Sequence, residues 1–116
     1  MNVLDAIKNR RSIRKYKEEP VSEEQVTQVL EAGRWAATKG NRQPWSFIIL
    51  KDAQIRNELA NVLATGKFLS EAPLGIAVIV NPEDSVYAVQ DGAAATQNIV
   101  AGGPCSRARR VLDQRL

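Results

Sequence analysis

Three arginines and one serine lie within five residues near the N-terminus, and their side chains could bind a phosphate. They are Arg10, Arg11, Ser12 and Arg14. A guanidinium matches a phosphate through two parallel hydrogen bonds, and a serine hydroxyl adds one more donor. A charge run of this kind is also common on a solvated surface, and composition alone favours that interpretation.

A second polar segment, residues 38–43, ends at Pro44 and leads into the apolar run of residues 46–50. Within it, Gly40 is able to adopt a positive φ. Taken alone the segment is a plain connecting loop, in which Asn41 and Gln43 hydrogen-bond to nearby backbone groups. It gains interest only in combination with the arginine cluster that precedes it.

The apolar spacing predicts the elements that position these segments. A short helix begins after Asn2, and longer helices begin at Ser22, Asp52 and near Ser85. Residues 47–50 and 74–80 are apolar without alternation, which predicts two strands covered on both faces. Because two strands do not make a stable sheet, we expect a partner chain or further sequence to supply others.

Small residues gather in two of the predicted helices, at residues 32–37 and 93–95. Such stripes bury little area alone and imply the close approach of another element. We therefore expect both to lie at or near a dimer interface. Trp35, between the small residues of the first stripe, is expected to pack.

The composition excludes several classes of function. The sequence has one cysteine and no histidine, so a zinc site, a disulfide framework and a Ser–His or Cys–His catalytic pair are not expected. Residues 1–101 carry equal numbers of basic and acidic groups, and the net charge of +3 comes from the residues that follow. This placement argues against a nucleic-acid-binding domain. Without a membrane-length apolar run or a signal peptide, we expect a cytoplasmic chain.

The arginine cluster R-R-S-I-R, followed about thirty residues later by N-x-Q-P-W and a strand, resembles the nitroreductase family of FMN-dependent enzymes. The resemblance implies an α+β fold with a central mixed sheet flanked by helices. It also implies that the cluster grips the FMN phosphate and ribityl chain, and that the second segment contacts the flavin, often from the opposite protomer. The implied cofactor-binding residues are Arg10, Arg11, Ser12, Arg14, Thr38, Lys39, Asn41 and Gln43. No catalytic or metal-binding residue is implied, because the flavin carries the chemistry.

The sequence after Val100 departs from the pattern of the family, in which the helix continues at this point. Legal codons for residues 101–116, read one nucleotide out of frame, can encode LAAHALGLGGCWISD, which does continue a helix and resembles the family. We therefore expect a chain that is truncated or frameshifted after about Val100 and a fold that is incomplete at its C-terminus. Residues 1–101 form the nitroreductase-like domain, and residues 102–116 form an unrelated tail expected to be disordered.

The function that this resemblance implies is hydride transfer from NAD(P)H to a small electrophilic acceptor, such as a nitroaromatic or a quinone. It would follow a ping-pong mechanism in a homodimer, with no nucleic-acid or membrane partner. Two alternatives stay open. One is an inactive remnant of the family, and the other is a non-enzymatic module that binds a phosphate ligand or nucleic acid through the arginine cluster.

Overall fold

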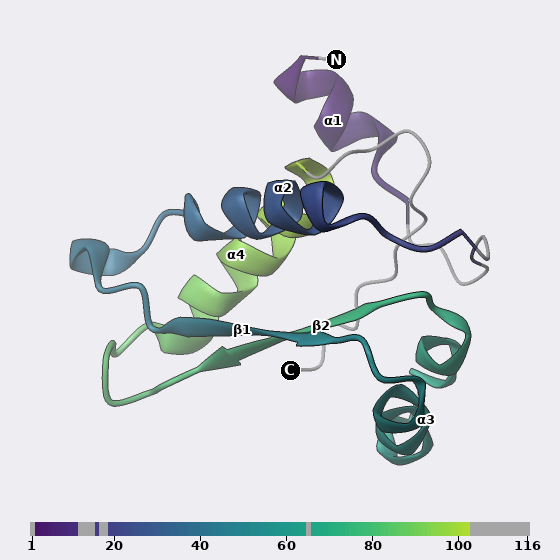
Figure 1. Ribbon diagram of the computed structural model, residues 1–116. Helices are drawn as coiled ribbons and strands as arrows, with labels where there is room; N and C mark the ends of the chain where they lie inside the picture. Colours follow the sequence, from purple (N-terminus) through teal and green to yellow (C-terminus); the bar gives the residue numbers. More distant parts are fainter. Residues whose placement is uncertain (1, 12–15, 17–18, 65, 103–116) are drawn as a thin grey trace.

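The computed structural model of the protein describes residues 2–11, 16, 19–64 and 66–102, and Figure 1 shows how their helices and strands are arranged. The elements are α1 (Val3–Asn9), α2 (Glu23–Arg34), the 3-10 turn η1 (Lys39–Asn41), β1 (Trp45–Leu50), α3 (Ala53–Val62), the 3-10 turn η2 (Lys67–Glu71), β2 (Gly75–Val80) and α4 (Ala88–Gly102). The predicted order of helices and strands is confirmed, and the fold is α+β. The tail, apart from Gly102, lies outside the described residues.

The helix starts follow from capping side chains. Asn2 Oδ1 accepts a hydrogen bond from the Asp5 N–H at 2.8 Å, and Asp52 caps α3 in the same way. At the start of α2, Ser22 and Gln25 form the predicted reciprocal capping box. The fourth helix begins at Ala88 rather than near Ser85, because residues 81–87 form turns.

The two strands pair antiparallel, with Trp45 opposite Val80 and Leu50 opposite Gly75. Alternate side chains therefore point to opposite faces of the sheet. One face joins the hydrophobic core together with residues of α2 and α4. The buried members of this core are Ala36, Trp45, Val78, Ala95 and Ile99, with Phe47 and Val80 packed against them.

The other face of the sheet is open in the described part of the chain. Ile48 and Ile79 on this face are 46% and 47% exposed. In Figure 1, α2 and α4 lie on one side of the sheet, and α3 lies beyond one end. The prediction that both strands are covered on both faces is therefore wrong for the described residues, since only one face receives helices.

The small residues of α2 and α4 let these two helices approach each other. A Cβ atom on Gly33 would lie 2.9 Å from Cγ1 and Cδ1 of Ile99. Beside this contact, Asn98 Nδ2 donates a hydrogen bond to the Ala32 carbonyl at 3.1 Å. The predicted close approach is real, but it is made within one chain, so these small residues do not argue for a dimer.

Trp35 does not pack into the core. Its side chain is 73% exposed at the end of α2, where Nε1–H donates to Glu31 Oε1 at 2.7 Å. The Arg34 guanidinium lies 5.8 Å from the ring centroid. The prediction that Trp35 packs is wrong, because α2 ends at this residue and leaves its side chain exposed.

Candidate functional site

The loop formed by residues 38–43 holds an unusual backbone conformation. Gly40, Asn41 and Gln43 have φ values of 60°, 55° and 49°. Asparagine adopts this left-handed region more readily than most residues, whereas glutamine has no such preference. Strained backbone of this kind concentrates at functional sites, where surrounding contacts hold it in place. We call residues 38–43 the flavin loop, after the role that the family resemblance gives it.

A buried carboxylate holds the first residue of this loop. Thr38 Oγ1 donates a hydrogen bond to Asp91 Oδ2 at 2.9 Å, and the same hydroxyl oxygen accepts the Gln43 N–H at 3.1 Å. Ser85 Oγ also donates to Asp91 Oδ2, at 3.2 Å. Asp91 and Ser85 are only 6% and 5% exposed. The sequence patterns did not single out Asp91 as part of the site.

The amide side chains of the flavin loop contact each other. Gln43 Nε2 donates to Asn41 Oδ1 at 3.0 Å and to the Asn41 carbonyl at 3.3 Å. Both residues are exposed. This local bonding is what the connecting-loop interpretation predicts, yet among the described residues it leaves Gln43 Oε1 able to accept a hydrogen bond from a ligand.

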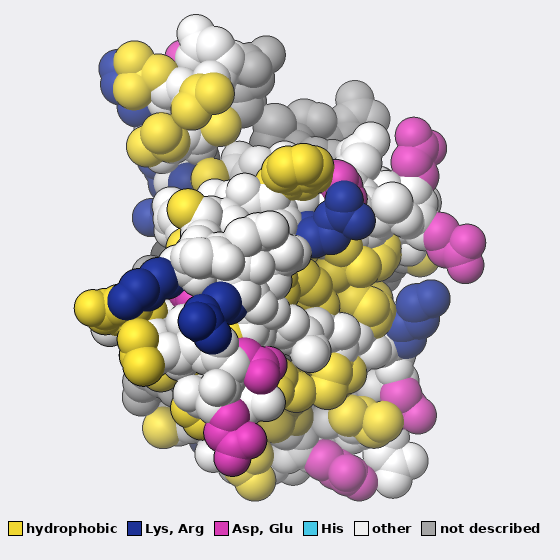
Figure 2. All heavy atoms as spheres, turned by 90° about the vertical axis from the view of Figure 1, so that its left-hand side faces the viewer, with side chains coloured by type: hydrophobic (Ala, Val, Ile, Leu, Met, Phe, Trp, Pro, Cys, Tyr) yellow, Lys and Arg dark blue, Asp and Glu magenta, His cyan; other side chains and the backbone are white. Residues whose placement is uncertain are grey.

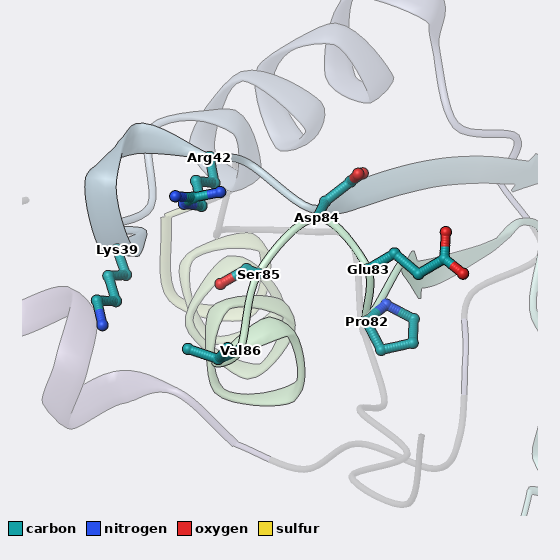
Figure 3. A pocket seen from close by; sticks show the side chains of 7 residues that line it. All are labelled: Lys39, Arg42, Pro82, Glu83, Asp84, Ser85 and Val86. Atoms are coloured by element: carbon teal, nitrogen blue, oxygen red, sulfur yellow. The ribbon is translucent and has the colours of Figure 1, made fainter.

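Two cations border an open pocket beside the flavin loop. The pocket has a volume of about 270 Å³ and lies between η1 and the turn that joins β2 to α4. Figure 3 shows Lys39 and Arg42 at one side, with the carboxylates of Glu83 and Asp84 turned away from them. Lys39 Nζ lies 4.8 Å from the Tyr87 ring centroid. The sequence predicted Lys39 as a site residue but missed Arg42, which the pocket brings next to it.

The arginine cluster follows directly after α1. Arg11 Nη1 donates to the Lys8 carbonyl at 2.8 Å and to the Arg10 carbonyl at 2.9 Å. These bonds stabilise the end of the helix, where carbonyls lack helical partners. Arg11 is exposed and Arg10 is partly buried. Ser12 and Arg14, the other two predicted residues of the cluster, lie outside the described residues.

The two predicted halves of the site lie apart within one chain. Figure 1 shows the end of α1 and the η1 turn at opposite ends of α2. Since α2 has 12 residues, it is about 18 Å long at 1.5 Å per residue. The structure therefore keeps Arg10 and Arg11 apart from the flavin loop within one copy of the chain.

The described residues form neither a metal site nor a membrane-spanning helix. Across the ranges that the structure describes, no three histidine, cysteine, aspartate or glutamate side chains gather in a way that could hold a metal ion. None of the helices described here has the length and apolar character needed to cross a membrane.

Comparison with known proteins identifies the fold. The sequence pattern of the nitroreductase family matches residues 7–75, which include the first arginines and the whole flavin loop. The chain belongs to the nitroreductase family. This nitroreductase-family protein is 36% identical over 106 residues to an Archaeoglobus fulgidus protein provisionally named NADH dehydrogenase/NAD(P)H nitroreductase.

Two solved structures show the same arrangement. An FMN-dependent nitroreductase from Clostridium difficile is 32% identical, with a TM-score of 0.78 over 83% of this chain and 57% of the other. A provisionally named nitroreductase from Desulfovibrio desulfuricans, solved in complex with FMN, is 37% identical, with a TM-score of 0.80 over 88% and 62%. The match to the A. fulgidus relative covers 88% of this chain and 61% of that protein. The chain thus spans about three fifths of these relatives.

Proposed function

We propose that this nitroreductase-family protein is an FMN-dependent oxidoreductase that passes hydride from NAD(P)H to a small electrophilic acceptor, such as a nitroaromatic or a quinone, in a ping-pong cycle. The observation that carries the proposal is the strained flavin loop, which lies within the segment that the family pattern matches and is held by the buried carboxylate of Asp91. The likeness to a D. desulfuricans nitroreductase solved with FMN supports the cofactor.

The chemistry of the two halves fits the two ends of FMN. Guanidinium groups at Arg10, Arg11 and Arg14, together with the Ser12 hydroxyl, are donors suited to a phosphate. At the flavin loop, Lys39 supplies a cation and Gln43 an amide, which can hydrogen-bond the polar edge of a flavin ring. An exposed cation there also favours the negative charge that a flavin gains on reduction.

When bound, FMN supplies the hydride chemistry, and the chain supplies binding, orientation and electrostatics. Thr38, Asn41 and Lys39 would then hold and orient the ring, while the arginine cluster fixes the opposite end. The sequence has no histidine that could serve as a proton donor. This division of labour agrees with a site in which no side chain is named as catalytic.

The separation of the two halves at the ends of α2 supports a site shared by two copies of the chain. In a homodimer, the arginine cluster of one protomer can lie beside the flavin loop of its partner. Apolar surface that a second copy could cover is present: Val3, Leu4 and Ile7 of α1 are all more than half exposed. Figure 2 shows hydrophobic side chains gathered on the surface of the part that projects at the top of the view.

The test is a flavin-binding comparison with a charge-reversal pair. Arg14→Glu should weaken FMN binding about tenfold or more, because a well-formed charge-assisted bond contributes about 1.5–3 kcal/mol. Riboflavin, which lacks the phosphate, should bind the parent weakly and be less sensitive to Arg14→Glu. Lys51→Glu, an equal charge change at an exposed residue after β1, is the control. FMN affinity that is the same in Arg14→Glu and the parent would contradict the assignment.

Activity is tested by NAD(P)H oxidation with a quinone or nitroaromatic acceptor. A ping-pong cycle gives parallel lines in double-reciprocal plots at several acceptor concentrations. Intersecting lines would exclude that mechanism. A protein that binds no FMN but binds nucleic acid with a strong salt dependence would instead favour the non-enzymatic alternative.

A further inference from the structure

Asp91, in α4, has a buried carboxylate that accepts one hydrogen bond from Thr38 of the flavin loop and one from Ser85 in the turn before α4. We infer that Asp91 is a positioning residue: through the Thr38 hydroxyl it sets the conformation of residues 38–43 and thereby the flavin contacts of Lys39, Asn41 and Gln43. The inference rests on the proposed function only for its flavin-binding consequence. Its structural part concerns the loop alone.

The surroundings of Asp91 are unusual for an acidic side chain. It is 6% exposed, and its described hydrogen-bond donors are the Thr38 and Ser85 hydroxyls, both on Oδ2. The ion pair that the described residues form is Arg34 with Glu31 on the surface of α2, so no cation there pairs with Asp91. Burying a carboxylate without a cation is costly. An apolar residue would serve packing alone better, so the carboxylate requires another explanation.

The direction of the hydrogen bonds supplies that explanation. A threonine hydroxyl has one proton to donate and an oxygen that can accept. A carboxylate oxygen accepts hydrogen bonds, so the Thr38 hydroxyl donates to Asp91 Oδ2. The lone pairs of the hydroxyl oxygen then face the loop. That oxygen then accepts the Gln43 N–H at 3.1 Å, which closes the loop across its two ends. Asp91 thus determines which way the Thr38 hydroxyl points, and the hydroxyl determines where Gln43 lies.

The loop needs such a clamp because its backbone is strained. Asn41 and Gln43 keep positive φ values of 55° and 49°, and the surrounding structure must compensate for such conformations. Within the loop, the Asn41 and Arg42 N–H groups bond to the carbonyls of Thr38 and Lys39. The Gln43 N–H, by contrast, depends on the Thr38 side chain. Loss of that one contact releases the end of the loop that leads into β1.

Ser85 provides a matched control. Its hydroxyl bonds to the same oxygen of Asp91, but its own oxygen accepts the Tyr87 N–H on the α4 side. Ser85→Ala therefore removes a bond to Asp91 of the same type while leaving the Thr38–Gln43 bond in place. If Asp91 acts only in packing α4, Thr38→Val and Ser85→Ala should have similar consequences.

The experiment combines amide hydrogen exchange with FMN titration on the full chain. The exchange rate of the Gln43 amide is compared with that of the Arg56 amide, which bonds to the Asp52 carbonyl at 3.1 Å at the start of α3. In Thr38→Val and Asp91→Ala, Gln43 should exchange about ten- to a hundredfold faster relative to Arg56, as expected for loss of a charge-assisted contact. FMN should bind about tenfold more weakly in both.

The control variants should behave differently. Thr38→Ser keeps the hydroxyl and should restore both the slow exchange of Gln43 and the FMN affinity of the parent. Ser85→Ala should leave the ratio of Gln43 to Arg56 exchange unchanged, whatever it does to the urea midpoint. Should Asp91→Ala not fold, Thr38→Val and Asp91→Asn carry the same test, since the asparagine amide oxygen accepts only a weaker bond from Thr38.

Two results would overturn the inference. In one, Thr38→Val and Asp91→Ala lower the global stability without a selective change at Gln43, which makes Asp91 a packing residue only. In the other, Gln43 exchange accelerates but FMN binds as in the parent, so that the loop conformation does not govern flavin contacts. If the parent itself binds no FMN, the proposed function fails, while the exchange data still decide whether Asp91 holds the loop.

Discussion

The left-handed backbone of Gln43 gives a stability prediction whose sign follows from the structure. Its φ is 49°, a conformation that costs an L-residue with a Cβ about 1–2 kcal/mol. Glycine avoids this cost but loses about 0.5–1 kcal/mol more conformational entropy on folding. Gln43→Gly should therefore raise the free energy of unfolding by about 0.5–1 kcal/mol.

The matched variant is Gln43→Ala, which removes the same side chain but keeps the Cβ and hence the strain. Both variants lose the exposed bonds to Asn41, so their difference isolates the backbone. Urea unfolding followed by tryptophan fluorescence measures it. For a slope near 2 kcal/mol per molar, the midpoints should differ by roughly 0.4 M, with Gln43→Gly the more stable.

Flavin affinity should move in the opposite direction. Both variants lack the amide that we assign to the flavin ring, so both should bind FMN more weakly than the parent. Gln43→Gly would then be more stable and a poorer binder at once. A glycine variant that unfolds at the same or a lower urea concentration than the alanine variant would refute the strain argument.

Four further changes test other parts of the structure. Gly33→Ala should destabilise the chain, because the added Cβ would lie 2.9 Å from Ile99. Such overpacking costs about 1–3 kcal/mol, whereas the gain in helix propensity is about 1 kcal/mol. Adding Ile99→Val to this variant should recover part of the lost stability in a thermal melt. Arg56→Met should cost about 1–3 kcal/mol, since the buried guanidinium donates to the carbonyls of Leu50 and Lys51, and an unchanged urea midpoint would contradict this. Ile7→Asp on the exposed face of α1 should weaken self-association in sedimentation without altering the circular dichroism of the monomer. Replacing residues 102–116 with the sequence of the alternative reading frame should raise FMN occupancy, and equal occupancy would count against the frameshift proposal.

The sequence predicted the parts of the fold that depend on local chemistry. The capping residues Asn2, Ser22 and Asp52 each begin a helix where expected, because a cap is decided by neighbours a few residues away. Both strands lie where uninterrupted apolar runs predict them. What covers those strands could not be predicted, since it depends on which elements of the chain return to the sheet.

The site was predicted unevenly for the same reason. The flavin loop was found from residues that adjoin in sequence, but its clamp joins Thr38 to Asp91, which is 53 positions away. A lone aspartate within a helix of small residues carries no local signal of such a contact. The position of Trp35 was mistaken because an aromatic residue beside a small-residue stripe looks buried, whereas the helix ends there and exposes it.

For the shared flavin site proposed above, the separation of Arg10 and Arg11 from the flavin loop by the length of α2 has a genetic consequence. Suppose that one chain carries Arg14→Glu and another carries Thr38→Val, each reducing flavin binding in its own homodimer. In a mixed dimer with shared sites, one site receives both defects and the other receives neither. Co-expression should therefore restore half of the flavin sites in the mixed dimers by subunit complementation, as neither chain can do alone. If each site were built within one chain, every site in the mixed dimer would keep one defect, and nothing would be restored.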